Sequence, residues 1–328
     1  MGSPYYMGID IGATLIKVGI VTSEGKLIAK EEVETRKLTS PAHLLSVSNE
    51  VASRLLRENT IRKESVGGIG VGAPGWVNYS EGIVYDLTNI PGWHSVALAA
   101  ELERETGLKS FVDNDANVMA LGEMVFGAGR TYRNLVCLTL GTGVGGAIII
   151  DGKLYRGASG LAGEIGHMTV DLNGRPCACG AMGCLERYVG IQFIVANALK
   201  RLQDLPKENK SILLEMAGNR FENITPELLS KAAAKGDEIA VAVWRDTGHF
   251  LGVTLAVLVN LLNPECFIIG GGVAKAGAVL FHPMRETMEA LAMNRVGKST
   301  PILQAQLGKD AGVIGAATFA MTCAEGQL

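Results

Sequence analysis

The chain has 328 residues, of which 48% are hydrophobic and 19% are charged, and its formal net charge at pH 7 is −3. This composition excludes a disordered chain and lacks the clustered basic residues with which proteins bind nucleic acid. The length exceeds that of a usual single core, so two domains are expected, with a single large barrel as the alternative. Because no basic footprint for nucleic acid is present, a small molecule is the expected ligand. The first residues have no basic segment followed by an apolar one, so the cytoplasm is the expected location.

Two segments follow the same plan, each with a glycine-rich first turn. GIDIGATLIKVGIVTSEGKLI, over 8–28, predicts strand, turn, strand, turn and strand, and LTLGTGVGGAIIIDGKLY, over 138–155, repeats the order. Each half of the chain is therefore expected to open with an antiparallel meander. Two related halves that face each other would create a cleft.

The first turns of these meanders indicate phosphate binding. Glycines let backbone N–H groups turn toward an anion, and the hydroxyls of Thr14 and Thr142 can add donors. GTGVGG formally fits a dinucleotide fingerprint, but 147–150 continue as a strand where that fingerprint requires a helix, and no Walker sequence is present. Two ordinary glycine hairpins are the alternative. The carboxylate of Asp10 lies where Mg²⁺ carrying nucleotide phosphates would bind.

A third polar group lies in FVDNDANVMALGEMVFGAG, over 111–129. An apolar strand is predicted to end near Val112, and a helix follows that ends at Gly127. The apolar side of this helix is expected to contain Val118, Met119, Leu121, Met124 and Val125. The acids and amides at 113–117 could simply cap the helix, but one acid would suffice for that. A carboxylate there could accept the proton of a sugar hydroxyl that attacks a phosphoryl group.

Three of the six cysteines lie within eight positions, in EIGHMTVDLNGRPCACGAMGCLE over 164–186. Such spacing in a reducing compartment is more typical of a metal site than of disulfides. His167, Cys177, Cys179 and Cys184 are the expected ligands of a closed, structural zinc site, and three incidental buried thiols are the alternative. Cys137, Cys266 and Cys323 stand alone in apolar runs and are expected in the core.

The most apolar segment, FLGVTLAVLVNLLNPECFIIGGG, is too interrupted to span a membrane. Asn263 and Pro264 break it, and neither half approaches the ~20 residues that a membrane helix needs. We expect a buried helix over about 245–262, a turn at Asn263-Pro264 and a short buried strand that ends in glycines.

These segments together resemble the ROK family (repressors, open reading frames and kinases), whose kinases are ATP-dependent sugar kinases with an actin-like, ribonuclease-H-like α/β fold of two lobes. The resemblance rests on the motifs GIDIGAT, GVGAPGWVN, TNIPGW, DNDAN, LGTGVGGA, GEIGH, CACGAMGCLE, IIGGGV and LGKDAGVIGAA, which cover nearly the whole chain. The first phosphate turn departs from the family pattern, because Ala13 replaces a glycine. That replacement is acceptable if residue 13 does not need a positive φ.

The resemblance implies a role for each matching residue. Asp115 would be the general base. The sugar would contact a set made of Asn114, Glu164, His167, Glu186, Gly75 and Asn89. His167 would also ligate zinc, which would fix His167 and Glu186 in place. The nucleotide would contact Asp10, Gly12, Thr14, Lys17, Gly141, Thr142, Gly143, Gly270 and Gly271.

The expected activity is transfer of the γ-phosphate of ATP to the 6-hydroxyl of a hexose, with Mg²⁺ as cofactor and structural Zn²⁺. Glucose is the expected sugar, and N-acetylmannosamine, N-acetylglucosamine and fructose are the alternatives. A sugar-responsive regulator without its DNA-binding module and a zinc-stabilised sugar-binding protein are alternatives of another class. The resemblance also implies a homodimer, with a first lobe over 1–118 plus 312–328 and a second over 119–311.

Overall fold

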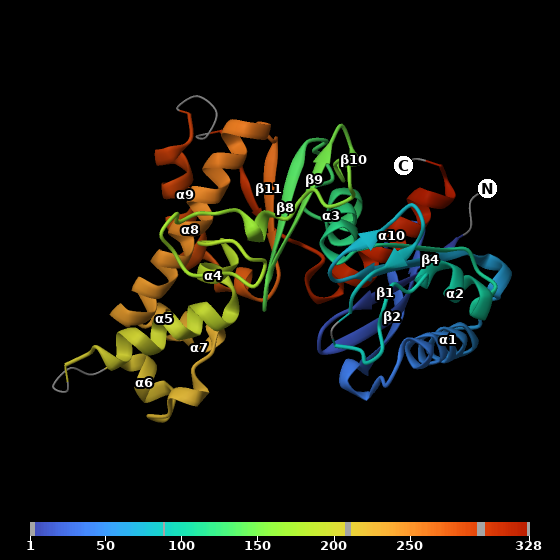
Figure 1. Cartoon of the computed structure of the whole chain (residues 1–328), viewed down its shortest axis with the longest axis horizontal. Coiled ribbons are helices and arrows are strands. Elements are labelled where there is room, and N and C mark those ends of the chain that lie inside the picture. The colour runs from blue at the N-terminus through green and yellow to red at the C-terminus, as the bar shows by residue number, and fades with distance from the viewer. Residues whose placement is uncertain (1–3, 88, 207–210, 294–298, 327–328) are drawn as a thin grey trace. The chain divides into compact units, whose positions relative to one another are not determined.

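The structure is a computed structural model that describes residues 4–87, 89–206, 211–293 and 299–326 (Figure 1). The chain forms two compact units. The first contains Met1–Asn134, Ala147–Gly163 and Ala305–Leu328, and the second contains Leu135–Gly146 and Glu164–Gln304. The first unit thus takes in residues 119–134, 147–163 and 305–311, which the sequence analysis assigned to the second lobe. The assignment of the two domains stays a prediction.

The first unit is built on a five-stranded sheet of order β3-β2-β1-β4-β7. Its strands are β1 (Tyr5–Ile11), β2 (Leu15–Thr22), β3 (Leu27–Glu34), β4 (Val66–Ala73) and β7 (Ser110–Asn114), with a small ribbon of β5 (Val77–Asn78) and β6 (Ile83–Val84). Its helices are α1 (Pro41–Glu58), α2 (Leu98–Thr106), α3 (Asp115–Phe126) and α10 (Ala311–Ala324), with 3-10 turns η1 (Thr35–Lys37), η2 (Lys63–Ser65) and η6 (Gly308–Asp310). β1 pairs antiparallel with β2 and parallel with β4, which confirms the predicted meander.

Side-chain alternation along β1 directs helices to both faces of this sheet. Met7, Ile9 and Ile11 point into a core shared with α1, whereas Tyr6 faces a smaller core shared with α10. Helix α10 approaches very closely because β1 and β4 carry glycines on that face. A Cβ on Gly70 would lie 1.7 Å from the carbonyl oxygen of Ala316. Any larger residue would therefore push α10 away from the sheet.

The second unit contains β8 (Leu135–Leu140), the start of β9 (Val144–Ile150), β11 (Cys266–Gly270) and β12 (Ile302–Gln304). Its helices are α4 (Glu186–Val189), α5 (Ile191–Gln203), α6 (Ile212–Met216), α7 (Pro226–Ala234), α8 (Glu238–Leu262) and α9 (Ala278–Leu291), with 3-10 turns η3 (Ile165–His167), η4 (Phe221–Asn223) and η5 (Val273–Ala276). The sheet order is β10-β9-β8-β11-β12, where β10 is Lys153–Leu154. This order repeats that of the first sheet, so the repeat in the sequence is also a repeat in topology.

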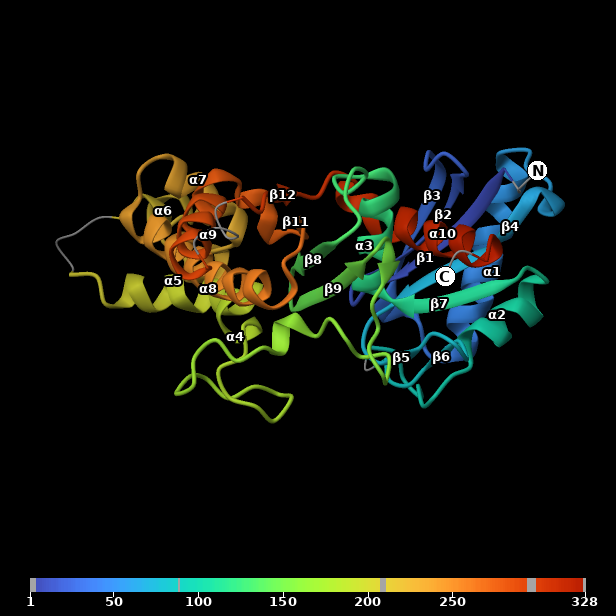
Figure 2. The same cartoon turned by 90° about the horizontal axis from the view of Figure 1, so that it is seen from above.

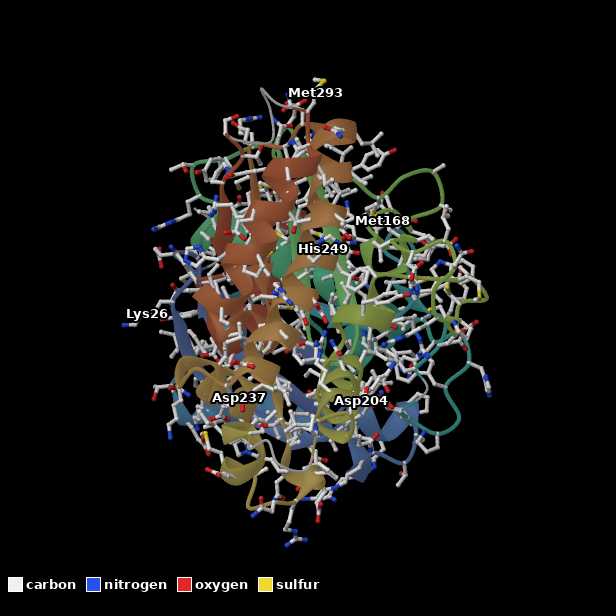
Figure 3. The ribbon with its side chains drawn as sticks, turned by 90° about the vertical axis from the view of Figure 1, so that its left-hand side faces the viewer. Lys26, Met168, Asp204, Asp237, His249 and Met293 are labelled. Atoms are coloured by element: carbon white, nitrogen blue, oxygen red, sulfur yellow. The ribbon has the colours of Figure 1, made fainter. Side chains whose placement is uncertain are left out.

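The long helix α8 begins earlier than predicted. The sequence analysis placed its start near residue 245, but α8 begins at Glu238, because the carboxylate of Asp237 accepts a hydrogen bond from the amide of Ala240 and caps the helix. Figure 3 shows Asp237 at the start of α8 and His249 farther along it. The predicted turn is confirmed, because Asn263 has a φ of 47° at the end of the helix, and β11 follows.

The three cysteines outside the predicted metal cluster differ in burial. Cys137 and Cys266 are buried as predicted, but Cys323 is only partly buried, because it lies near the end of α10, where the chain reaches the surface. Among the described residues, no helix is both long and apolar enough to cross a bilayer.

Candidate active site

The first unit gathers polar groups where β7 passes directly into α3. The strand extends two residues beyond its predicted end, to Asn114, and the helix begins at Asp115 and ends before Gly127 as predicted. The side chain of Asn114 has two roles. Its Oδ1 accepts a hydrogen bond from the amide of Ala116 at 2.9 Å, and its Nδ2 donates one to the carbonyl of Gly75 at 3.2 Å. The helix cap therefore also fixes the loop that follows β4.

Asp115 lies at the first position of α3 and is partly exposed. Its Oδ1 accepts a hydrogen bond from the amide of Ala116 at 2.8 Å. The N-terminus of a helix interacts favourably with a negative charge, so this position suits a carboxylate. Gly75, with a φ of 80°, lies beside this corner, whereas Asn89 is exposed and no hydrogen bond joins it to Asn114 within the described chain.

Behind this corner lies a buried ion pair that the sequence analysis did not predict. Asp113 is 2% exposed, and it accepts hydrogen bonds from Nε and Nη2 of Arg156 at 2.9 and 2.6 Å. It also accepts one from Nδ2 of Asn117 at 2.9 Å and one from the amide of Asn114 at 2.7 Å. The guanidinium of Arg156 stacks 4.0 Å above the ring centre of Tyr79. The network fixes the turn from β7 into α3, and no local pattern around Arg156 indicates it.

The buried side of α3 also differs from the predicted one. Val118 and Leu121 are buried, but Met119, Met124 and Val125 are only partly buried. Glu123 is buried instead, because its carboxylate accepts hydrogen bonds from the amides of Ala128, Gln306 and Leu307. A carboxylate with three backbone donors is stable in the interior, which periodicity of apolar residues cannot predict.

The first glycine turn joins β1 to β2. Oδ2 of Asp10 accepts a hydrogen bond from Nζ of Lys17 at 3.2 Å, and Gly12 donates its amide to the carbonyl of Leu15 at 3.0 Å. Thr14 and Ala13 are exposed. Ala13 is not among the residues with a positive φ, so the turn does not require the glycine that the family usually has there.

In the second unit, the four predicted metal ligands come together. The ligand atoms of His167, Cys177, Cys179 and Cys184 all lie within 4.8 Å of one another. Sγ of Cys179 and Sγ of Cys184 are 3.6 Å apart, and Sγ of Cys177 lies 3.7 Å from Nδ1 of His167. A tetrahedral zinc ion separates two sulfur ligands by about 3.8 Å and a sulfur and a nitrogen by about 3.6 Å. The donor set and its dimensions therefore fit zinc, with Nδ1 of His167 as the ligating atom.

Glycines allow the chain to turn tightly around the cysteines. Gly180 and Gly183 have φ values of 92° and 67°, and a Cβ on Gly183 would lie 1.7 Å from the carbonyl oxygen of Asp171. Burial raises the pKa of the Cys184 thiol to about 12, whereas a backbone hydrogen bond from Ala181 lowers the pKa of Cys179. These shifts describe the free thiols, and a bound metal ion would favour both thiolates.

The two predicted sugar-binding glutamates flank this cluster. Glu164 is exposed, and its carbonyl accepts the amide of His167 at 3.0 Å. Glu186 begins α4, and its Oε2 accepts a hydrogen bond from the amide of Val144 at 3.0 Å. The cluster and Glu186 belong to one chain segment, and the hydrogen bond from Val144 to Glu186 connects this segment to the second glycine turn. Figure 2 shows α4, which Glu186 begins, below the strands β8 and β9 that this turn joins.

The second glycine turn, 141–143, joins β8 to β9. The carbonyl of Gly141 accepts the amide of Ile191 at 3.0 Å, which connects this turn to α5, and Thr142 is exposed. Gly270 ends β11, and Gly271 follows with a φ of 85°. A Cβ on Gly271 would lie 2.2 Å from the carbonyl oxygen of Leu140. The glycines predicted to contact the nucleotide in this unit therefore lie at the ends of neighbouring strands.

Comparison with known proteins shows which family the chain belongs to. Residues 6–322 match the ROK family. The chain belongs to the ROK family. A relative named glucokinase from Halalkalibacterium halodurans is 39% identical over 96% of this chain and 94% of its own length. The fold is therefore that of the ROK sugar kinases, the actin-like α/β fold that the sequence predicted.

Two solved structures show how far the similarity extends. A ROK family glucokinase from Streptomyces griseus, in complex with glucose and AMPPNP, is 35% identical, has a TM-score of 0.83 and is matched over 97% of this chain and 99% of its own. A ROK family transcriptional regulator, a homologue of the E. coli MLC protein, has a TM-score of 0.87 at 26% identity, and 79% of its chain is matched by 98% of this one. Both classes of ROK protein thus share this fold.

Replacing Arg156 by Met should destabilise the first unit strongly. The change leaves the carboxylate of Asp113 buried without its cation, which costs about 3–5 kcal/mol of unfolding free energy. Urea denaturation followed by circular dichroism measures the loss. Arg54→Met is the matched control, because its ion pair with Glu31 in the same unit is much more accessible, with side chains 42% and 34% exposed, and its loss should change stability little. Equal losses in the two variants would contradict the structural role of Arg156.

Proposed function

We propose that this protein is an ATP-dependent glucokinase that transfers the γ-phosphate of ATP to the 6-hydroxyl of glucose. The observation that carries the proposal is the carboxylate of Asp115 at the start of α3, in a chain that is 35% identical to a glucokinase structure with glucose and AMPPNP. The relatives named glucokinase match nearly the full chain, which supports glucose as the sugar. N-acetylmannosamine, N-acetylglucosamine and fructose remain the runner-up substrates.

In this proposal Asp115 is the general base. It takes the proton of the sugar 6-hydroxyl while the hydroxyl oxygen forms a bond to the γ-phosphorus and the bond from that phosphorus to the bridging oxygen of ADP breaks. Asn114 is assigned to sugar hydroxyls, and its hydrogen bond to Gly75 holds the neighbouring loop in place. Asn89 is assigned to the sugar on the resemblance alone.

The second unit is assigned to the rest of the sugar and to the nucleotide. The carboxylates of Glu164 and Glu186 would accept hydrogen bonds from sugar hydroxyls. His167 would form a hydrogen bond to the sugar through Nε2, since Nδ1 would ligate zinc. Zinc held by His167 and the three cysteines would be structural, since four protein ligands leave no open position. Its effect is to fix the segment between Glu164 and Glu186.

Nucleotide contacts are assigned to both glycine turns. Backbone N–H groups at Gly12, Gly141 and Gly143, with the hydroxyls of Thr14 and Thr142, would face the phosphates, and Gly270 and Gly271 would lie by the nucleoside. Asp10 of β1 and Lys17 of β2 form an ion pair next to the first turn, so the carboxylate of Asp10 orients the ammonium group of Lys17. Mg²⁺, when bound with ATP near Asp10, would neutralise phosphate charge. A homodimer and a cytoplasmic location stay predictions.

A coupled assay of ADP formation tests the proposal directly. With ATP and Mg²⁺, glucose should give the highest kcat/KM in a panel that includes mannose, fructose, allose, N-acetylglucosamine and N-acetylmannosamine, and the product should be the 6-phosphate. A higher kcat/KM for an N-acetylhexosamine would replace glucose by the runner-up. Absence of sugar-dependent ADP formation would favour the sugar-binding protein or the regulator, a class whose solved structure shares this fold.

Substituting Asp115 by Asn should lower kcat by about 10²- to 10⁴-fold, because an amide cannot accept the hydroxyl proton. The KM for glucose and the thermal midpoint should change little, since Asn has the shape of Asp and its amide oxygen can still accept the hydrogen bond from the amide of Ala116. Asp151→Asn is the control, as Asp151 is an exposed residue of the same unit that already has a positive φ, which Asn tolerates. A D115N variant with near-normal kcat would refute the assignment of the base.

Removing zinc should release reactive thiols and weaken glucose binding. Elemental analysis should find one zinc per chain, and a chelator should add two thiols, those of Cys177 and Cys179, to those that react with Ellman's reagent at pH 8. Cys184 should stay unreactive, because burial raises the pKa of its free thiol to about 12. Cys266 and Cys323 should stay unreactive in both states, because burial raises their pKa values to about 12 and only the thiolate reacts. The KM for glucose should rise after chelation and recover with added zinc. A chelator-independent thiol count would contradict the metal site.

A further inference from the structure

The carboxylate of Glu186 occupies the space that a side chain on residue 143 would need. A Cβ built on Gly143 would lie 2.5 Å from Oε2 of Glu186, nearer than atoms without a bond can approach. Gly143 is not among the glycines with a positive φ, so its backbone does not itself require glycine. A side chain at residue 143 would therefore have to displace the carboxylate of Glu186.

A hydrogen bond holds the carboxylate in that space. Oε2 of Glu186 accepts the amide proton of Val144 at 3.0 Å, and a bond between an amide and an ionised carboxylate is among the stronger hydrogen bonds of proteins. Within the described chain, Oε1 of Glu186 has no hydrogen-bond partner. One oxygen of Glu186 is thus used to fix the side chain, and the other is available to a ligand.

The same backbone segment is contacted on its other side by the turn that contains His167. A Cβ on Gly166 would lie 2.2 Å from the carbonyl oxygen of Val144, so η3 packs directly against this residue. Val144 therefore lies between the two ends of the zinc-binding segment, with its amide bonded to Glu186 and its carbonyl against Gly166. The residue that follows the second glycine turn is therefore in contact with both ends of the zinc-binding segment.

We propose that Gly143 is a positioning residue for the sugar: by lacking a side chain, it lets Glu186 bond to the amide of Val144, and this bond directs the second carboxylate oxygen to a sugar hydroxyl. The inference rests on the proposed function, because it requires Glu186 to contact the sugar. It changes the role of Gly143, which the sequence pattern assigns to the nucleotide. Loss of the glycine should weaken glucose binding before any nucleotide is present.

The test is the dissociation constant of glucose, measured by isothermal titration calorimetry without nucleotide. Gly143→Ala should raise it by about 10- to 100-fold, which is the effect of losing a hydrogen bond to a charged group. Gly141→Ala, in the same turn, should change it by less than about threefold, because nothing lies within 4 Å of a Cβ there. Gly272→Ala, which also has open space around its Cβ, controls for the substitution itself.

A double-mutant cycle shows whether Gly143 acts through Glu186. If it does, the G143A/E186A variant should bind glucose no more weakly than E186A alone, because the carboxylate that Gly143 accommodates is already gone. The removal of Glu186 also relieves the steric conflict, so the double variant should recover the thermal midpoint that G143A loses. Both measurements use the full chain with its zinc.

The outcomes separate the two proposals. If E186A weakens glucose binding but G143A does not, or if the two effects add, the positioning role of Gly143 is wrong and the sugar assignment stands. A G143A variant with normal glucose binding and a raised KM for ATP would return Gly143 to the phosphates. If E186A binds glucose normally, Glu186 does not contact the sugar and both proposals fail at this residue.

Discussion

The structure depends on backbone segments that approach one another more closely than any side chain would allow. Helix α10 lies on β1 and β4 at distances that a Cβ on Gly70 would prevent, and Gly183 makes an equally close approach to Asp171. In the second unit the same constraint applies to Gly166 and Gly271. Close packing of this kind fixes the position of loops that have little apolar surface of their own. The close contacts at Gly166 and Gly183 lie next to His167 and Cys184, two of the predicted metal ligands.

The two units fix their functional residues by different means. In the first, a buried ion pair between Asp113 and Arg156 fixes the strand-to-helix corner from behind, so that Asn114 and Asp115 face outward from a rigid support. In the second, four side chains that fit a metal ion connect residues that the chain separates by up to 17 positions. A loop that long loses much conformational entropy when it is ordered, and a metal ion can offset that loss.

The parts of the structure that depend on short local patterns could be predicted from the sequence. Turns rich in glycine, the acids after a buried strand and the spacing of cysteines are local patterns, and they predicted both meanders, the corner at Asp115 and the four-residue cluster. The start of α8 was missed because the cap at Asp237 lies 13 residues before Phe250, where the most apolar stretch begins. Arg156 and Glu123 were missed because their partners are distant in sequence. Periodicity assigns a charged residue to the surface unless a long-range partner is known.

The shared strand order of the two sheets bears on the origin of this chain. A meander followed by two parallel strands occurs twice, which is the expected result of a gene duplication. The copies have since diverged at the same turn. The first completes its turn with an ion pair inside its own hairpin, while the second relies on a carboxylate supplied from more than forty residues downstream. Sequence change in the first copy is therefore limited by its immediate neighbours, whereas change at the turn of the second copy is also limited by Glu186, at the end of the segment that contains the predicted metal ligands.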